Sequence, residues 1–188
     1  MSDISRRGFI AAAGGAVAAV WLTADAASLL ASGRHASLSS DDDPFKFLTA
    51  DQAADLDAAT SQLIPSDGTP GAHEARVVYF IDQSLATWAK EQRPVFSSGI
   101  AELRKRASAA VPGATSFASL TAEQQRAVIA SLEKDKHQFF FALRGATIVG
   151  MFANPEYGGN ADKTGWKLIG FDDRFSWAPP FGWYDAHA

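Results

Sequence analysis

The sequence predicts an all-α protein: a compact bundle of about five helices, followed by an extended C-terminal tail rich in Gly, Pro and aromatic residues. Two threonines form capping boxes ahead of apolar residues at helical spacing. No stretch shows a strong alternation of apolar and polar residues. The 188 residues are 47% hydrophobic and 20% charged, which suits one domain with its own core.

The first two expected helices are separated by a turn. Thr49 and Gln52 form a capping box before an apolar repeat that ends ahead of Pro65, and residues 66–71 are turn formers. A second helix, from about His73 to Gln92, is indicated by four apolar residues on one face, namely Val77, Ile81, Leu85 and Trp88.

Three further helices complete the expected domain over residues 45–153. Pro94 ends the preceding helix and starts the next one, which runs to about Pro112. Thr121 opens a second capping box, with Gln124 at its third helical position. Residues 134–152 are strongly apolar, so we expect them to form the central buried helix.

The composition changes after Asn154. Residues 155–188 contain eight aromatic residues, five glycines and three prolines. Such a segment cannot form a long helix, and it has too many large apolar groups for a solvated linker. We expect the tail, residues 154–188, either to fold back on its own body or to cover another protein. Composition alone leaves both open.

The N-terminal residues are typical of an export signal. Arg6 and Arg7 precede an apolar run that reaches about Leu22 and is too short to span a membrane. This pattern indicates a twin-arginine signal over residues 1–27, and residues 28–44 are an expected linker. The twin-arginine route exports proteins that are already folded. Because it is an export route, the expected location is the periplasm.

Composition excludes several kinds of chemistry. The chain has no cysteine, which excludes disulfides, thiolate nucleophiles and cysteine-ligated iron–sulfur clusters. Its net charge of −4, without a basic patch, argues against nucleic-acid binding. No nucleotide-binding glycine loop, nucleophile elbow or clustered histidine pair is present. One acid–base alternative remains, in which Glu156 is a general acid paired with Asp162, Asp172 or Asp173.

Two motifs near the C-terminus resemble a known family. They read Thr147-x-x-Gly150-x-x-x-x-Pro155-x-Tyr157-Gly158-Gly159-Asn160 and Gly165-Trp166-x-x-Ile169-Gly170-Phe171. With the helix opened by Leu48-Thr49 and the Asp67-to-Ala72 turn, they resemble gluconate 2-dehydrogenase subunit 3. This is the small subunit of membrane-associated flavin dehydrogenases, and the resemblance covers about residues 45–175.

The resemblance implies a subunit without a cofactor or catalytic residues of its own. It would bind a large FAD-containing catalytic subunit of the glucose-methanol-choline oxidoreductase type and lend it the twin-arginine signal. In related complexes a haem c subunit takes the electrons, and the substrates are gluconate, other sugars or glycosides. The substrate of this complex cannot be carried over, because its catalytic residues would lie on another chain.

The aromatic tail is the expected interface with this partner. Tyr and Trp combine a large apolar face with one polar group, and paired glycines allow close backbone approach. The expected interface residues are Pro155, Tyr157, Gly158, Gly159, Asn160, Gly165, Trp166, Ile169, Phe171, Trp177 and Trp183. Alternatively, the loop simply covers the helical body. A rival function is a free-standing carbohydrate-binding module that stacks sugars on Trp166, Trp177 or Trp183.

Overall fold

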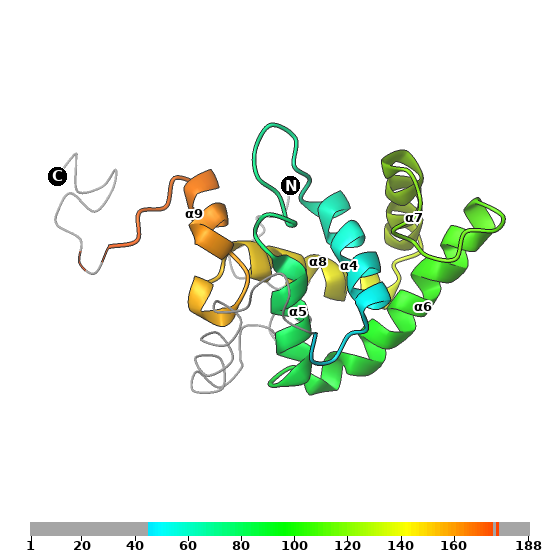
Figure 1. The fold of residues 1–188 in the computed structure, drawn as a ribbon, viewed down its shortest axis with the longest axis horizontal. Helices are drawn as coiled ribbons and strands as arrows, with labels where there is room; N and C mark the ends of the chain where they lie inside the picture. The colour runs from blue at the N-terminus through cyan, green and yellow to red at the C-terminus, as the bar shows by residue number, and fades with distance from the viewer. Residues whose placement is uncertain (1–44, 175, 177–188) are drawn as a thin grey trace, which may run out of the picture.

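The computed structural model describes residues 45–174 and residue 176, and this part of the chain is helical without a strand (Figure 1). The elements are α4 (Ala50–Leu63), α5 (Val77–Ala86), η1 (Lys90–Gln92), α6 (Arg93–Ala110), α7 (Ala122–Lys134), α8 (Gln138–Phe152), η2 (Pro155–Tyr157), η3 (Ala161–Lys163) and α9 (Thr164–Leu168). The five helices expected before residue 153 are α4 to α8. The all-α prediction is therefore confirmed.

Local sequence sets the start of three helices as predicted. Thr49 caps α4, accepting from the Gln52 N–H at 3.3 Å while its own N–H donates to the Gln52 side chain at 3.0 Å. Thr121 and Gln124 form the same reciprocal pair at the start of α7. Pro94 lies in the first turn of α6, where its missing N–H is not needed.

Helix α5 is shorter than the predicted helix over residues 73–92. Arg76 takes a left-handed backbone conformation, with φ 55°, so the helix begins only at Val77. At the other end Thr87 leaves the helical region, and its N–H donates to the carbonyls of Gln83 and Ser84. The predicted apolar stripe is still correct: its three members within α5, Val77, Ile81 and Leu85, are fully buried.

Helix α8 packs against α4, α5, α6, α7 and α9. One side of it is buried in the core, with Phe139 edge-to-face against Phe96 of α6 at 5.7 Å. Gly99 of α6 makes room for the Phe139 ring, because a Cβ at this glycine would overlap that ring. The predicted helix is therefore confirmed, although it starts at Gln138, but the prediction that it is buried holds for one side only, since Phe141 and Ile148 are exposed.

Two buried carboxylates join segments that are distant in sequence. Asp82 of α5 accepts hydrogen bonds from the backbone N–H groups of Lys46, Phe47 and Leu48, at 2.8 to 2.9 Å. Asp55 of α4 pairs with Arg104 of α6 and also accepts from the Ala118 N–H at 2.9 Å. Each buried charge is thus compensated, as burial requires.

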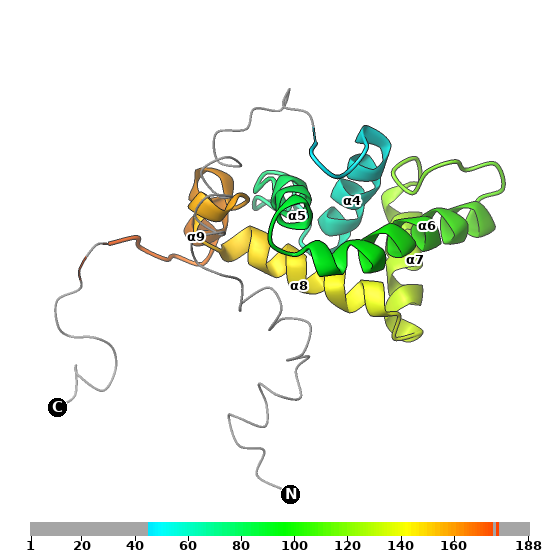
Figure 2. The same ribbon diagram turned by 90° about the horizontal axis from the view of Figure 1, so that it is seen from below.

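The ends of α8 are covered differently. Figure 2 shows α7 near the N-terminal end of α8, and α9 beyond its C-terminal end. The chain thus continues from α8 into short helical turns that remain against the body through residue 168. The predicted signal with Arg6 and Arg7, the linker over 28–44, and the interface residues Trp177 and Trp183 lie outside the described residues.

Candidate partner-binding site

The predicted interface loop closes the C-terminal end of α8. The last carbonyls of a helix have no partner within the helix. Here the Asn160 N–H donates to the Gly150 carbonyl at 2.7 Å, and Asn160 Nδ2 donates to the Ala153 carbonyl at 2.8 Å. The Trp166 Nε1–H donates to the Phe152 carbonyl at 2.8 Å. Residues 160 and 166 therefore supply N–H donors to carbonyl groups at the end of α8 that have no partner within the helix.

Asn160 is the central residue of this loop. It is fully buried, and its backbone is left-handed, with φ 44°. Its Oδ1 accepts from the Gly165 N–H at 2.8 Å, so its amide uses both ends. Asparagine suits this position because it tolerates left-handed backbone and carries both an acceptor and a donor.

Glycines allow the loop to approach α5 and α8 closely. A Cβ at Gly159, where φ is +77°, would overlap the Gly150 carbonyl oxygen and lie 3.0 Å from the Phe80 Cβ. A Cβ at Gly165 would overlap the Met151 carbonyl. A Cβ at Gly150 would lie 2.9 Å from the Phe80 ring. This part of the motif therefore serves close packing within the chain.

The structure divides the predicted interface residues by exposure. Gly158, Gly159, Asn160 and Gly165 are buried, and Pro155, Tyr157 and Trp166 are half-buried. Among the predicted interface residues that the structure describes, the exposed large apolar ones are Ile169, at 60%, and Phe171, at 47%. The buried members hold the loop in place, and these two provide its outer surface.

Sequence reasoning missed three further exposed apolar side chains. Leu168 of α9 is 39% exposed, Phe141 of α8 is 40% exposed, and Ile148 of α8 is 42% exposed. The two on α8 could not be found by periodicity, because that helix is apolar on all sides, a pattern normally read as full burial.

Trp166 is engaged within the protein. Besides the hydrogen bond to Phe152, its ring lies 4.9 Å from the Phe171 ring in an edge-to-face arrangement. Lys163 Nζ lies 6.0 Å from the centre of the Trp166 ring. These contacts occupy part of the indole surface that stacking on a sugar would use.

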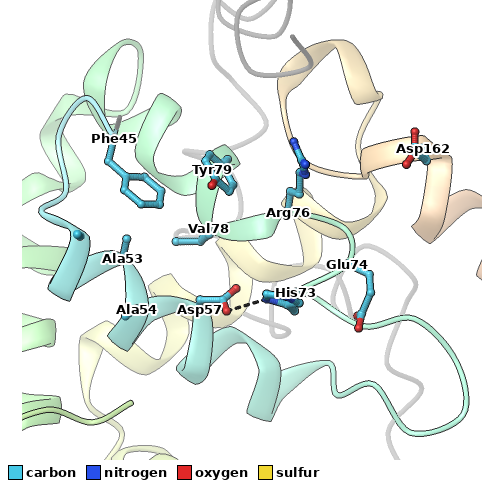
Figure 3. Close-up of a pocket in the computed structure, with 11 residues that line it drawn as sticks. Phe45, Ala53, Ala54, Asp57, His73, Glu74, Arg76, Val78, Tyr79 and Asp162 are labelled. Atoms are coloured by element: carbon cyan, nitrogen blue, oxygen red, sulfur yellow. Dashed lines mark hydrogen bonds and ion pairs between the residues drawn. The ribbon is translucent and has the colours of Figure 1, made fainter. Parts of the chain in front are cut away.

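A separate pocket of about 630 Å³ lies between α4, α5 and η3 (Figure 3). Phe45 and Tyr79 stack at 5.0 Å on one side of it. On the other side His73 Nδ1 lies 2.8 Å from Asp57 Oδ2. The remaining lining residues are Ala50, Ala53, Ala54, Glu74, Arg76, Val78 and Asp162.

The charged groups of this pocket stabilise its own loop. Glu74 accepts from the Ser66 hydroxyl at 2.7 Å and from the Gly71 N–H at 2.8 Å, and these bonds, the first above all, lower the pKa of Glu74. The pocket lining holds no Ser or Cys that the His73–Asp57 pair could activate.

The acid–base alternative centred on Glu156 stays a prediction, with Asp162 exposed on η3 and the other two candidates in ion pairs. Glu156 is exposed on η2 and does not line the pocket. Of its candidate partners, Asp172 pairs with Arg174, and Asp173 pairs with Lys163 at 2.8 Å. Within residues 45–174 no three acidic or histidine side chains gather as a metal site would require.

The comparison with protein families gives a match over residues 50–173, to the family described as gluconate 2-dehydrogenase subunit 3. The chain belongs to the gluconate 2-dehydrogenase subunit 3 family. The matched range starts at α4 and ends just after Phe171, so it includes the loop that closes α8. Searches of curated proteins and of solved structures gave no match to the chain.

Membership of this family makes the chain a subunit of a multi-subunit dehydrogenase. The matched range contains both the buried motif around Asn160 and the exposed residues Ile169 and Phe171. Among the helices that the structure describes, none combines the length and apolarity needed to cross a bilayer.

Proposed function

We propose that this chain is the non-catalytic small subunit of a periplasmic, FAD-dependent sugar or polyol dehydrogenase complex. It binds the large flavin-containing subunit, stabilises it, and brings it through the twin-arginine export route. The observation that carries this proposal is the family match, which spans the whole helical body from α4 to α9.

Two features of the chain support the proposal. Arg6 and Arg7 stand before an apolar run, as a signal for folded cargo requires. Large apolar side chains remain exposed on α8 and after α9, as expected of a protein that functions in a complex. FAD is proposed on the large partner, and haem c on a third subunit, where electrons would leave.

The test is recovery of the complex from the periplasm of the native host. A tagged chain is purified, and the eluate is analysed by mass and by its absorbance spectrum. We expect a larger protein in about equal amount with the absorbance bands of a flavin, and a haem band where the third subunit is retained. A colourless, monomeric eluate would refute the proposal.

A separate variant tests the proposed role in export. Replacing Arg6 and Arg7 together by Lys keeps the charge but changes the paired arginines that define the signal. We expect this variant to leave both the chain and the flavin subunit in the cytoplasm. Replacing Arg34 by Lys, outside the signal, is the matched control and should not change their location.

A further inference from the structure

One side of α8 is apolar, and the helices that the structure describes leave it partly exposed. Phe141 and Ile148 lie seven residues apart, which places them on the same side of the helix, and they are 40% and 42% exposed. Gly145 and Phe152 extend this side and are half-buried. Figure 2 shows α8 along the edge of the helical body, with α4 and α5 above it.

The segment after α8 carries further exposed apolar side chains and lies against the C-terminal end of this helix. The Phe152 ring lies against Gly165, since a Cβ there would be 3.0 Å from Phe152 Cδ1. The Trp166 side chain donates a hydrogen bond to the Phe152 carbonyl and lies edge-to-face against Phe171. We call this surface the α8–α9 face, made of Phe141, Ile148, Phe152, Leu168, Ile169 and Phe171.

The charged groups of α8 and α9 have one sign. Arg144 is the only charged residue of α8, Lys167 is the only one of α9, and both are exposed. Neither has an ion-pair partner among the described residues, whereas Asp172 and Asp173 are paired with Arg174 and Lys163. An acidic protein, with a net charge of −4, thus carries on α8 and α9 two exposed positive charges that no described residue pairs, on the same helices as exposed apolar side chains.

From this arrangement we infer that the α8–α9 face is the docking surface for the large catalytic subunit. That subunit would meet it with an apolar patch bordered by carboxylates, which complement Arg144 and Lys167. This inference rests on the proposed function and adds where the partner binds and with what chemistry. Leu168, Ile169 and Phe171 would then act together with Phe141 and Ile148.

Two other occupants fit the charges less well. In a symmetric dimer the same patch forms both sides of the interface, so the positive Arg144 and Lys167 would meet a surface with positive charges and repel. An anionic lipid surface is usually bound by about four to eight clustered basic residues, and these helices carry only Arg144 and Lys167. An acidic, apolar protein surface satisfies both features of the face.

The test uses the chain co-expressed with its large subunit. Ile148→Glu places a carboxylate in the middle of the face, and Ala130→Glu places the same group on the exposed side of α7. We expect Ile148→Glu to reduce recovery of the large subunit about tenfold or more, because an unpaired charge would be buried in the interface. Ala130→Glu should recover as much as the wild type.

Charge reversal supplies a second, independent variant. Arg144→Glu combined with Lys167→Glu leaves the apolar residues in place and should weaken the complex, with a loss that shrinks at high salt. Circular dichroism and thermal melting of each isolated variant verify that it folds. Should Ile148→Glu fail this check, Ile148→Ser and the charge-reversed variant decide the question.

The possible outcomes separate the inference from the proposed function. If the wild type recovers no flavin subunit, the proposed function fails. If the wild type recovers it and the folded face variants recover it equally, the face is not the docking surface, although the proposed function stands. The inference would also be overturned if the face variants kept the complex but lost self-association, which would assign the face to a second copy of the chain. The same holds if they kept the complex but lost binding to phosphatidylglycerol vesicles, which would assign the face to lipid.

Discussion

At the scale of single residues, Asn160 connects the loop to the end of α8. Its side chain joins the Ala153 carbonyl to the Gly165 N–H, and the residue itself is fully buried. A buried polar group that loses its partner costs far more than the net gain of forming one hydrogen bond. The residue is therefore a structural requirement of the motif.

Asn160→Ala removes both hydrogen bonds of the side chain. It also places alanine, which has no polar side chain, in a left-handed backbone conformation. We expect the free energy of unfolding to fall by about 2–4 kcal/mol, measured by urea denaturation. Asn154→Ala is the matched control, since it removes one bond, to the Glu156 N–H, and should cost about 1 kcal/mol. Equal losses in the two variants would contradict a central role for Asn160.

Gly159 and Gly170 form a second matched pair. Both have positive φ, +77° and +67°, but only Gly159 is crowded, by the Gly150 carbonyl and Phe80. Gly170→Ala should therefore cost only the backbone strain, about 1 kcal/mol. Gly159→Ala should cost about 2 kcal/mol more, because backbone has to move. Thermal melting of both variants measures the difference, and similar melting temperatures would refute it.

At the scale of elements, the two capping boxes act locally. Each threonine satisfies an N–H of the first turn of its helix, in α4 for Thr49 and in α7 for Thr121. They lie in separate helices without shared partners, so their contributions to stability are expected to add.

Thr49→Ala and Thr121→Ala should each lower the free energy of unfolding by about 1 kcal/mol, and the double variant by about 2 kcal/mol. Equilibrium unfolding in urea provides the measurement. Thr69→Ala, in the exposed turn before α5, is the control and should change stability by less than about 0.5 kcal/mol. A double variant no less stable than either single one would show that the caps do not act independently.

The elements also show what the sequence can and cannot predict. The starts of α4, α6 and α7 follow from residues within one turn, so the capping pairs and Pro94 indicate them directly. The length of α5 depends on the left-handed Arg76, for which the sequence carries no turn signal. The exposure of Phe141 and Ile148 depends on which helices lie beside α8, which no local pattern records.

The motif around Asn160 shows, for the candidate site, what can be predicted from sequence and what cannot. Its residues were singled out from sequence, but their roles differ, since Gly159 and Gly165 are buried and Ile169 is exposed. That division depends on contacts with Phe80 of α5 and Met151 of α8, two helices outside the motif's own loop. Tertiary packing alone determines it.

At the scale of the whole molecule, two glutamates couple stability to pH. The Ser66 hydroxyl and the Gly71 N–H lower the pKa of Glu74 from its ordinary value of 4.5. The hydrogen bond from Arg106, at 2.9 Å, lowers the pKa of Glu102 in the same direction. A lowered pKa in the folded state stabilises the protein above the unfolded pKa, and this contribution is lost as the pH falls through the folded value.

The melting temperature should therefore drop as the pH falls below 4.5, partly through these two groups. Glu74→Gln with Glu102→Gln should make this drop shallower and lower stability at neutral pH by less than about 1 kcal/mol, since both groups are near solvent. Melting curves across this pH range measure it. Glu91→Gln, an exposed control on η1, should leave the slope unchanged, and an unchanged slope in the double variant would refute the assignment.

The closure of α8 by residues 160 and 166 also has a consequence for biosynthesis. While the ribosome is still making the chain, α8 emerges before the donors that complete its last turn. Its terminal carbonyls, and the Phe80 surface that Gly159 covers, stay open until the tryptophan at position 166 has left the exit tunnel. The end of α8 is thus closed only after residues 160 and 166 are both free to fold, and a chain stopped before residue 166 would present an open helix end to chaperones and proteases.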